Sequence, residues 1–310
     1  MKELAIIEEI KKSLSSDYIG DDCANLKDLG IVVTQDSLVE DVHFLRRFAT
    51  PFQLGYKSIA VNISDIYAAG AIPKYFTVSL SLPKNIETNF IKDFYEGAKE
   101  ALNGAIIVGG DVTGADKIFI SVAAIGSTKG RNISSRKNAK VGYKIITNGV
   151  HGSGSAGLYA FLNNLDVPQK ITNAHLMPEI SPDLSETIAT FAKKDYAMMD
   201  SSDGLMDAIF KIAQSSNLTA KIDFQKIPYD KEIENIKDFD YKNAIFYGGE
   251  DYKLICAVSN EDLAKVNKNL YTEIGEFIEK TDENFIVIKY NENVEYLKKE
   301  DIEQKLFLHF

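Results

Sequence analysis

The sequence is poor in the residues that hold small extracellular scaffolds together. Its 310 residues include only two cysteines, Cys23 and Cys256, which lie far apart and form no CxxC pair. Two distant cysteines exclude a disulfide scaffold and fit a reducing cytosol, so we expect a cytoplasmic protein. The four histidines show no HxxxH-type spacing, which argues against a zinc site. With 20 glycines and 7 prolines, the composition also excludes a collagen-like or disordered chain.

The chain also lacks an excess of basic residues and a long apolar run. Lys and Arg total 35 against 45 Asp and Glu, a formal net charge of −10, so we expect no nucleic-acid partner. No stretch approaches the roughly 20 apolar residues that cross a bilayer, so we expect no membrane partner. The N-terminal segment MKELAIIEEIKKSL mixes charged and apolar residues, which predicts an amphipathic helix rather than a signal peptide.

The order of predicted elements indicates an α/β protein with two domains, in agreement with a length of about twice the usual domain size. In the first half, apolar patterning predicts strands at 30–37, 75–82, 105–111 and 117–126 and helices at 51–70 and 87–103, with Thr50 as the N-cap of the first helix. Segment 127–140 carries five basic residues, no acidic residue and no apolar periodicity. We therefore expect one domain over residues 1–138 and a second over 139–310.

The second domain is expected to alternate in the same way. Its predicted strands are 143–150, 195–199, 221–224, 252–258 and 285–290, and its predicted helices begin at 154 and span about 184–194, 204–216 and 260–269. Each domain is long enough to form a core of its own.

Carboxylates recur beside turns, usually just after an apolar strand. The six segments are GDD (20–22), TQD (34–36), ISD (63–65), GGD (109–111), MDSSD (199–203) and GGED (248–251). Any one of them could be an ordinary turn or helix start. Six together indicate converging carboxylates, which repel one another unless a cation lies among them. Oxygen ligands select hard ions such as Mg²⁺, and this combination points to phosphoryl transfer.

The familiar phosphate-binding motifs are absent. The sequence has no GxxxxGK[ST] loop and no HRD or DFG set of a protein kinase. GSGSAG (152–157) matches GxGxxG, but the expected acidic strand end is replaced by HLMPEISPD, so a tight strand-to-helix turn is the favoured interpretation. Arg136, in the basic segment, could reach a polyphosphate.

The motifs resemble those of the thiamine-monophosphate kinase family in order and spacing. The resemblance is carried by GDDCANL, TQDSLVEDVHF, NISDIYAAGAIP, GGDVTGA, MDSSDGLMD and GGEDYKL and covers nearly the whole chain. It implies a two-domain α/β fold like that of aminoimidazole ribotide synthetase, with an N-terminal sheet that pairs with its copy in a homodimer and a C-terminal domain that closes over the nucleotide. It also implies phosphorylation of thiamine monophosphate to the diphosphate by direct in-line transfer from ATP, with several Mg²⁺ ions.

The resemblance also assigns roles to individual residues. It implies metal ligands at Asp22, Thr34, Gln35, Asp36, Asp65, Asp111, Asp200 and Asp203. It implies ATP contacts at Gly110, Asp111, Arg136 and Ser202, and contacts to the thiamine end at His43, Glu250 and Phe307. Gln35 stands where the family usually has Thr, and Phe307 where another aromatic is frequent.

Three alternatives remain open from the sequence. Two are sister enzymes, a selenophosphate synthetase and a hydrogenase-maturation ATPase, and the third is a nucleotide- or thiamine-phosphate-binding module without turnover. The chain ends KLFLHF, without the cysteine-bearing tail expected of the ATPase, and Cys23 follows GDD rather than lying in a flexible arm. Cys23 is expected to be a small buried thiol. No catalytic base or nucleophile is required, because a phosphate acceptor is already mostly dianionic at neutral pH.

Overall fold

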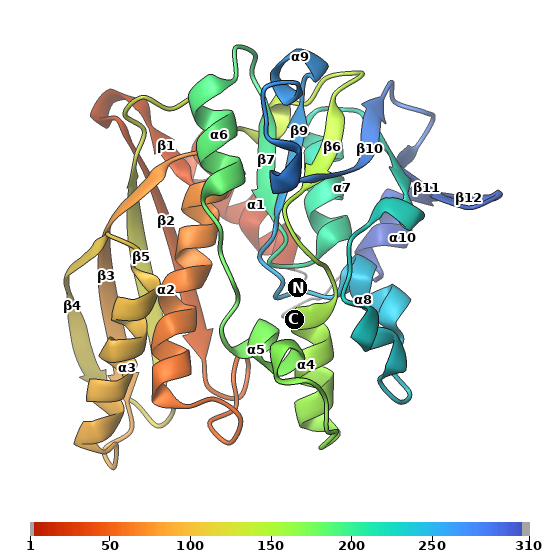
Figure 1. Ribbon diagram of the computed structural model, residues 1–310. Helices are drawn as coiled ribbons and strands as arrows, with labels where there is room; N and C mark the ends of the chain where they lie inside the picture. The colour runs from red at the N-terminus through yellow and green to blue at the C-terminus, as the bar shows by residue number, and fades with distance from the viewer. Residues whose placement is uncertain (1–2, 306–310) are drawn as a thin grey trace.

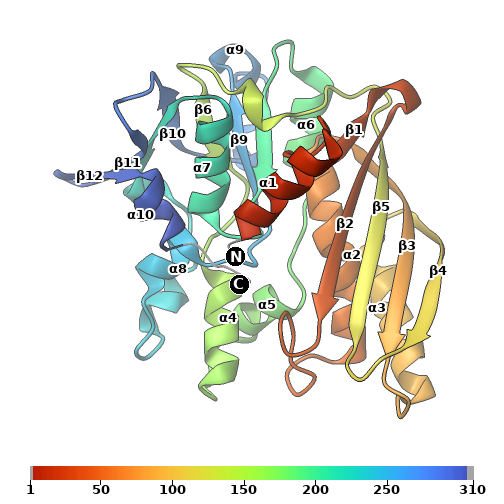
Figure 2. The ribbon, with the colours of Figure 1, turned by 180° about the vertical axis from the view of Figure 1, so that it is seen from behind.

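The computed structural model describes residues 3–305, with side chains from residue 6, and contains two β-sheets (Figure 1). The first sheet has five strands in the order β1-β2-β5-β3-β4. Its strands are β1 (Ala24–Leu26), β2 (Ile31–Val39), β3 (Ile72–Leu82), β4 (Ile106–Gly114) and β5 (Phe119–Ser127). Helices α2 (Pro51–Ala68) and α3 (Thr88–Ala101) cover one face, and no described helix covers the other, which faces the viewer in Figure 2.

Helix α2 is the central element of the molecule. Thr50 caps it as expected: its side chain accepts a hydrogen bond from the backbone N–H of Gln53, and its own backbone N–H donates to Gln53 Oε1 at 2.9 Å. These two bonds form a capping box, and Pro51 follows as the first helical residue. The helix packs unusually close to α3, since a Cβ at Gly55 would lie 1.8 Å from the carbonyl oxygen of Phe94. This glycine lets α2 and α3 lie close side by side over the first sheet.

The second sheet has seven strands in the order β12-β11-β8-β10-β6-β9-β7, of which only the β8–β11 pair is parallel. Its strands are β6 (Lys144–Thr147), β7 (Ala197–Asp200), β8 (Thr219–Asp223), β9 (Leu254–Val258), β10 (Thr272–Ile278), β11 (Asn284–Tyr290) and β12 (Asn293–Lys298). The remaining helices are α1 (Glu3–Leu14), α4 (Ser153–Leu162), α5 (Gln169–Leu176), α6 (Asp183–Phe191), α7 (Leu205–Ser215), α8 (Tyr241–Tyr247), α9 (Asn260–Leu263) and α10 (Lys299–Glu303). None of the described helices is long and apolar enough to cross a membrane.

The two sheets do not have wholly separate cores. Ile63 and Ile66 of α2 belong to the same buried cluster as Met198 of β7 and Cys256 of β9. A second cluster lies within the C-terminal half, around α7 and β8. The expectation of one core per half therefore fails for the first half, because α2 is buried on nearly all sides and packs against the second sheet as well as its own.

Several elements differ from the sequence expectation. The helix expected over 260–269 ends at Leu263, and strands β10 and β12 and helices α5 and α8 were not expected. Both strands are polar and only partly buried, so they lack a clear period of two. Helix α5 fits between Pro168, which precedes its first residue, and Pro178, just beyond its end, in a segment that looked broken by proline.

Candidate active site

Three carboxylates from distant parts of the chain converge between the two sheets. One ligand oxygen each of Asp22, Asp65 and Asp200 lies within 4.8 Å of the others. Asp22 precedes β1, Asp65 lies in the last turns of α2, and Asp200 ends β7. The sequence expected these three to meet, and the fold brings them together because α2 is placed against both β2 and β7.

Neighbouring polar groups orient these carboxylates. Thr34 Oγ1 donates to Asp65 Oδ2 at 2.6 Å, and Ser64 Oγ donates to Asp200 Oδ2 at 2.6 Å. Ser202 Oγ also donates to Asp200, at 3.0 Å. Thr34 and Ser202 therefore lie at the cluster, and their roles as a metal ligand and an ATP contact, which the resemblance implies, stay predictions.

Burial and mutual repulsion disfavour the ionised form of the carboxylates in this cluster. Burial, together with the charges of Asp36, Asp200 and Asp22, raises the pKa of Asp65 well above its usual value. Burial and neighbouring carboxylates also raise the pKa of Asp200 to about 7 and that of Asp36 to about 6. Buried carboxylates that resist ionisation together are suited to a hard divalent cation, which neutralises them through oxygen ligands. The donor set thus fits Mg²⁺.

We expect Mg²⁺ to stabilise the fold more strongly at pH 8 than at pH 5. Because the folded-state pKa values of Asp36 and Asp200 are raised, these groups favour folding when protonated, and the contribution is lost as pH rises through about 6 to 7. Mg²⁺ competes with those protons, so its binding strengthens over the same range. At a hundredfold excess over Kd the gain is about 2.7 kcal/mol. Thermal melts with and without Mg²⁺ at both pH values check this, and an equal Tm rise at pH 5 and pH 8 would contradict it.

Cys23 lies beside the cluster but is not poised to react. Its thiol donates to the backbone oxygen of Asp65 at 3.4 Å and is buried. Burial and the surrounding aspartates raise the pKa of the thiol well above its usual value, so the thiolate is disfavoured.

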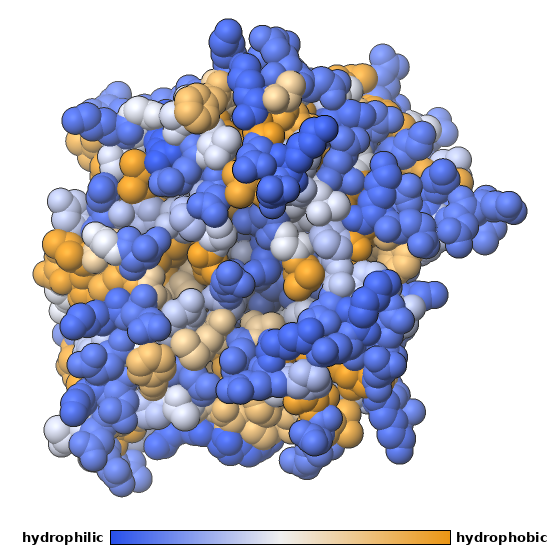
Figure 3. All heavy atoms as spheres, in the orientation of Figure 1, coloured by the Kyte–Doolittle hydropathy of each residue, from blue (hydrophilic) through white to orange (hydrophobic). Residues whose placement is uncertain are grey.

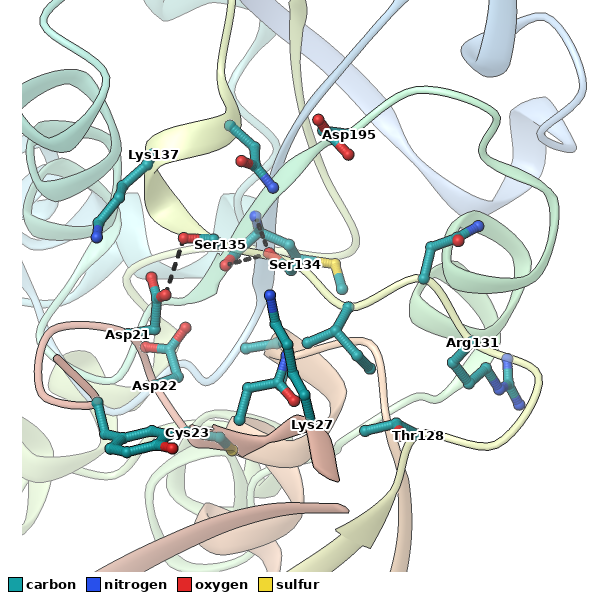
Figure 4. A pocket seen from close by; sticks show the side chains of 18 of the residues that line it. Asp21, Asp22, Cys23, Lys27, Thr128, Arg131, Ser134, Ser135, Lys137 and Asp195 are labelled. Carbon is teal, nitrogen blue, oxygen red and sulfur yellow. Dashed lines mark hydrogen bonds between the residues drawn. The ribbon is translucent and has the colours of Figure 1, made fainter. Parts of the chain in front are cut away.

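A basic side chain borders the cluster on one side. Arg136 forms an ion pair with Asp22, and its backbone N–H donates to Asp21 Oδ1 at 2.8 Å. Ser135 Oγ donates to the other oxygen of Asp21 at 2.8 Å, so the GDD segment is held against the connection between the two sheets (Figure 4). A cavity of about 900 Å³ lies next to this contact, with Lys27 and Lys137 in its lining.

Asp203 lies on the same side but has a different partner. Its Oδ2 lies 3.3 Å from Nζ of Lys211, which also pairs with the buried Asp207. Lys211 and Asp207 were not expected at the site. The one feature of the sequence that indicates their contact is the spacing of four residues on a predicted helix, which places an acidic and a basic side chain on one face.

Three residues assigned by the resemblance lie away from the cluster. In the sheet register Asp111 aligns with Ser79, Ser79 with Ser121 and Ser121 with Ser37, all on the face opposite α2. Gln35 lies on that face too, where its Nε2 donates to Ser121 Oγ at 3.0 Å. Asp111 and Gly110 are on the edge strand β4, three strand spacings or about 14 Å from β2. The side chains of Gln35 and Asp111 therefore do not reach the cluster within one chain.

Two of the residues expected at the thiamine end, His43 and Glu250, lie toward the other end of α2. Glu250 forms an ion pair with Lys57, Nδ1 of His175 lies 3.1 Å from the same carboxylate oxygen, and Tyr252 donates to the second oxygen at 3.3 Å. Burial alone would raise the pKa of Glu250, but Lys57 and His175 lower it to about 2. The Glu250 carboxylate is thus held as an anion.

A small cavity lies beside this group. It measures about 190 Å³ and is lined mainly by apolar side chains, together with His43, Lys57 and His175. His43 is held there by a hydrogen bond in which its Nδ1 accepts from the backbone N–H of Val39 at 3.1 Å. Phe307 lies outside the described residues. Lys57 and His175 were not expected at the site, because each is a single charged or polar residue in a helix and no motif surrounds it.

The GSGSAG segment (152–157) begins α4, with Gly152 as its N-cap at the end of the turn from β6. The backbone N–H groups of Gly152 and Gly154 donate to the Asp251 carboxylate at 2.6 and 2.8 Å. Asp251 therefore takes the donors that a dinucleotide phosphate would need, as expected for a structural turn.

Comparisons with known proteins agree with this arrangement. Residues 20–128 match the sequence model of the AIR synthase related protein, N-terminal domain, and residues 140–288 match that of the C-terminal domain. The thiamine-monophosphate kinase of Aquifex aeolicus (strain VF5) is 35% identical over 264 residues, which cover 82% of this chain and 84% of the relative. That of Bacillus subtilis (strain 168) is 33% identical over 284 residues, 86% of each chain.

Solved structures of related proteins are similar to the present structure as well. The structure of AaThiL complexed with AMPPCP and TMP has a TM-score of 0.84 and 32% identity and covers 96% of this chain and 97% of that chain. Hydrogenase maturation protein HypE in complex with ATP, at 19% identity and a TM-score of 0.68, shares the fold. The chain therefore belongs to the thiamine-monophosphate kinase family.

Proposed function

We propose that this protein transfers the γ-phosphoryl group of ATP to thiamine monophosphate and produces thiamine diphosphate and ADP. The observation that carries the proposal is the layout of α2. Lys57, which holds Glu250 beside an apolar cavity, and Asp65, in the carboxylate cluster, are eight residues apart on this helix, a separation of about 12 Å. An acceptor with heterocyclic rings at one end and a phosphate at the other can bridge these two groups.

Each end of the site would have its own task. Asp22, Asp36, Asp65, Asp200 and Asp203, with Thr34, would hold Mg²⁺ ions, which neutralise phosphate charge and align the two reacting phosphates. Arg136 and Ser202 would contact ATP, and His43, Glu250 and Phe307 would bind the thiamine end. None of these residues needs to act as a base, because the acceptor phosphate has a second pKa near 6. The main demand is to bring two anions together.

We expect no phosphoenzyme in the reaction, since the acceptor phosphate is itself the nucleophile. When the protein is mixed with γ-labelled ATP and Mg²⁺ without acceptor, no label should remain on the denatured protein. Added thiamine monophosphate should then carry the label into thiamine diphosphate. Stoichiometric label on the protein, which is transferred when acceptor is added, would overturn direct transfer.

We also propose a homodimer that forms through the first sheet, with residues 1–138 as the dimerisation domain and 139–310 as the domain that closes the site. The open face carries Tyr75 and Ile106, which are 47% and 53% exposed, and β4 is exposed along most of its length. Hydrophobic side chains gather at the left margin of Figure 3, where β4 lies in Figure 1. An exposed strand with apolar side chains is suited to pairing with a second copy. Gly110 and Asp111 could then serve the second copy's site.

Replacing Ile106 with Asp should convert the dimer to monomers, because it places a charge in the paired surface. Light scattering checks the mass. The control is Val294→Asp, at a residue 49% exposed on β12 at the edge of the other sheet, which should leave the mass unchanged. A wild-type protein that is monomeric at micromolar concentration would contradict the proposal.

A cytoplasmic location stays a prediction. Both cysteines are free and buried, in keeping with a reducing compartment.

A further inference from the structure

Lys211 occupies an unusual place on α7. Its Nζ lies 2.6 Å from Oδ2 of Asp207 and 3.3 Å from Oδ2 of Asp203. Asp207 precedes it by four residues, so the two side chains share one face of the helix. Helical side chains lean toward the N-terminus of their helix, which aims Lys211 at the loop that carries Asp200 and Asp203. A lysine in the second turn of α7 is thereby brought back to the carboxylate cluster.

Asp207 pairs with Lys211 and also lies within electrostatic reach of Arg136. The side chain of Asp207 is 4% exposed, and α7 packs against the turn that contains Arg136, where Ser216 Oγ donates to the Arg136 backbone oxygen at 2.8 Å. Burial raises the pKa of Asp207 to about 6, and the charges of Lys211 and Arg136 oppose that rise. A buried carboxylate without neighbouring cations would be costly, so Asp207 and the two cations form one unit.

One hydrogen-bond donor of this group, Nε of Arg136, is buried and has no hydrogen-bond partner among the described residues. Arg136 forms its ion pair with Asp22, and Lys211 forms one of its two ion pairs with Asp203. Both of these carboxylates are candidate metal ligands. If Mg²⁺ takes over these carboxylates, two cations on one side of the cluster are left facing the metal-bound phosphates.

We propose that Lys211 is a second phosphate-binding cation of this site, beside Arg136, and that Asp207 is the positioning residue that holds Lys211 toward the phosphate chain of ATP. The inference rests on the proposed function, because it takes ATP as the phosphoryl donor. In this structure Lys211 pairs with Asp203. With Mg²⁺ and ATP bound, it neutralises phosphate oxygens instead.

The test is Lys211→Met, which keeps much of the side-chain volume and removes the charge. KM for ATP should rise about tenfold or more, while KM for thiamine monophosphate stays within twofold. The half-saturating Mg²⁺ concentration, measured at saturating ATP, should fall severalfold, because a positive charge beside the metal ligands has been removed. A purely structural defect would not tighten the Mg²⁺ requirement. Lys211→Arg should restore KM for ATP to within threefold of the wild-type value.

The matched control is Lys144→Met. Lys144 is 24% exposed against 23% for Lys211, and it also pairs with two carboxylates, Glu273 and Glu276, but far from the cluster. It should leave both KM values and the Mg²⁺ requirement unchanged. Asp207→Asn should raise KM for ATP, and the Lys211→Met/Asp207→Asn double variant should be no worse than Lys211→Met alone, since both act through one contact.

An unchanged KM for ATP in folded Lys211→Met protein, or an unchanged Mg²⁺ requirement, would overturn the inference. The proposed function is judged separately, by whether the wild-type protein makes thiamine diphosphate. If the wild type makes it and Lys211→Met binds ATP normally, only the inference falls. If the wild type does not make it but Mg²⁺-ATP binding still depends on Lys211, measured by calorimetry, only the proposed function falls.

Discussion

Replacing Asp65 with Asn will lower kcat/KM by about a thousandfold or more and leave the fold intact. Asp65 lies in the carboxylate cluster with Asp22 and Asp200, and its loss removes a charged metal ligand. Folding should not suffer, because the pKa of Asp65 is raised well above its usual value by burial and neighbouring carboxylates. A neutral side chain of the same shape relieves that repulsion and can still accept the hydrogen bond from Thr34.

Steady-state kinetics and thermal melts measure the two effects. Without Mg²⁺, the Tm of the variant should equal or exceed that of the wild type, and the Tm rise on adding Mg²⁺ should be much smaller. Asp282→Asn is the control, because Asp282 is an exposed aspartate in a turn with a φ of 50°, which Asn accepts readily. Wild-type turnover by Asp65→Asn at limiting Mg²⁺ would mean that the cluster does not hold the catalytic metal. Asp36→Ala is expected to behave in the same way.

Thiamine, which lacks the phosphate, should be a very poor acceptor, with kcat/KM at least about a thousandfold below that of thiamine monophosphate. An alcohol needs a base, and none of the carboxylates beside the cluster is free for that role once metals bind. Thiamine also lacks the group that would meet the metal ions. Its rings can still reach Glu250, whose pKa is lowered to about 2 by Lys57 and His175 against the effect of burial, so the site keeps an anion for a cationic ring.

Thiamine should therefore act as a weak competitive inhibitor against thiamine monophosphate at saturating ATP and Mg²⁺. The comparison needs both acceptors in the same assay, with ADP and the thiamine product measured together. Similar kcat/KM values for the two acceptors would refute this account of acceptor choice. His43, which lines the cavity beside Lys57, would then be the first residue to test as a base.

The carboxylate cluster could be predicted because its signals are local. Asp200 directly follows the apolar segment 195–199, which predicts a strand. Asp65 lies in a helix whose start is predicted by Thr50, as the N-cap, and Pro51, as the first helical residue. Binding residues concentrate where loops meet a rigid scaffold, so several acidic residues at such places together indicate a site. The order and spacing of the motifs that carry these acidic residues then indicated the family.

The contacts that organise the site could not be predicted from the sequence. Lys57 and Glu250 are 193 residues apart, and a single lysine on a helix is typical of a solvent-exposed face. Lys57 is buried only because α2 lies between two sheets, a consequence of packing and not of its own periodicity. Asp111 shows the opposite case. Its motif resembles a metal-binding motif, but the sheet register places it on the face opposite α2.

The most direct test of the central claim is a product count. The purified protein is incubated with ATP, Mg²⁺ and thiamine monophosphate, and ADP and thiamine diphosphate are quantified over time. We predict that the two products form in equal amounts and that neither forms in the absence of thiamine monophosphate. Formation of ADP without thiamine diphosphate, or no ADP at all under saturating conditions, would contradict the account.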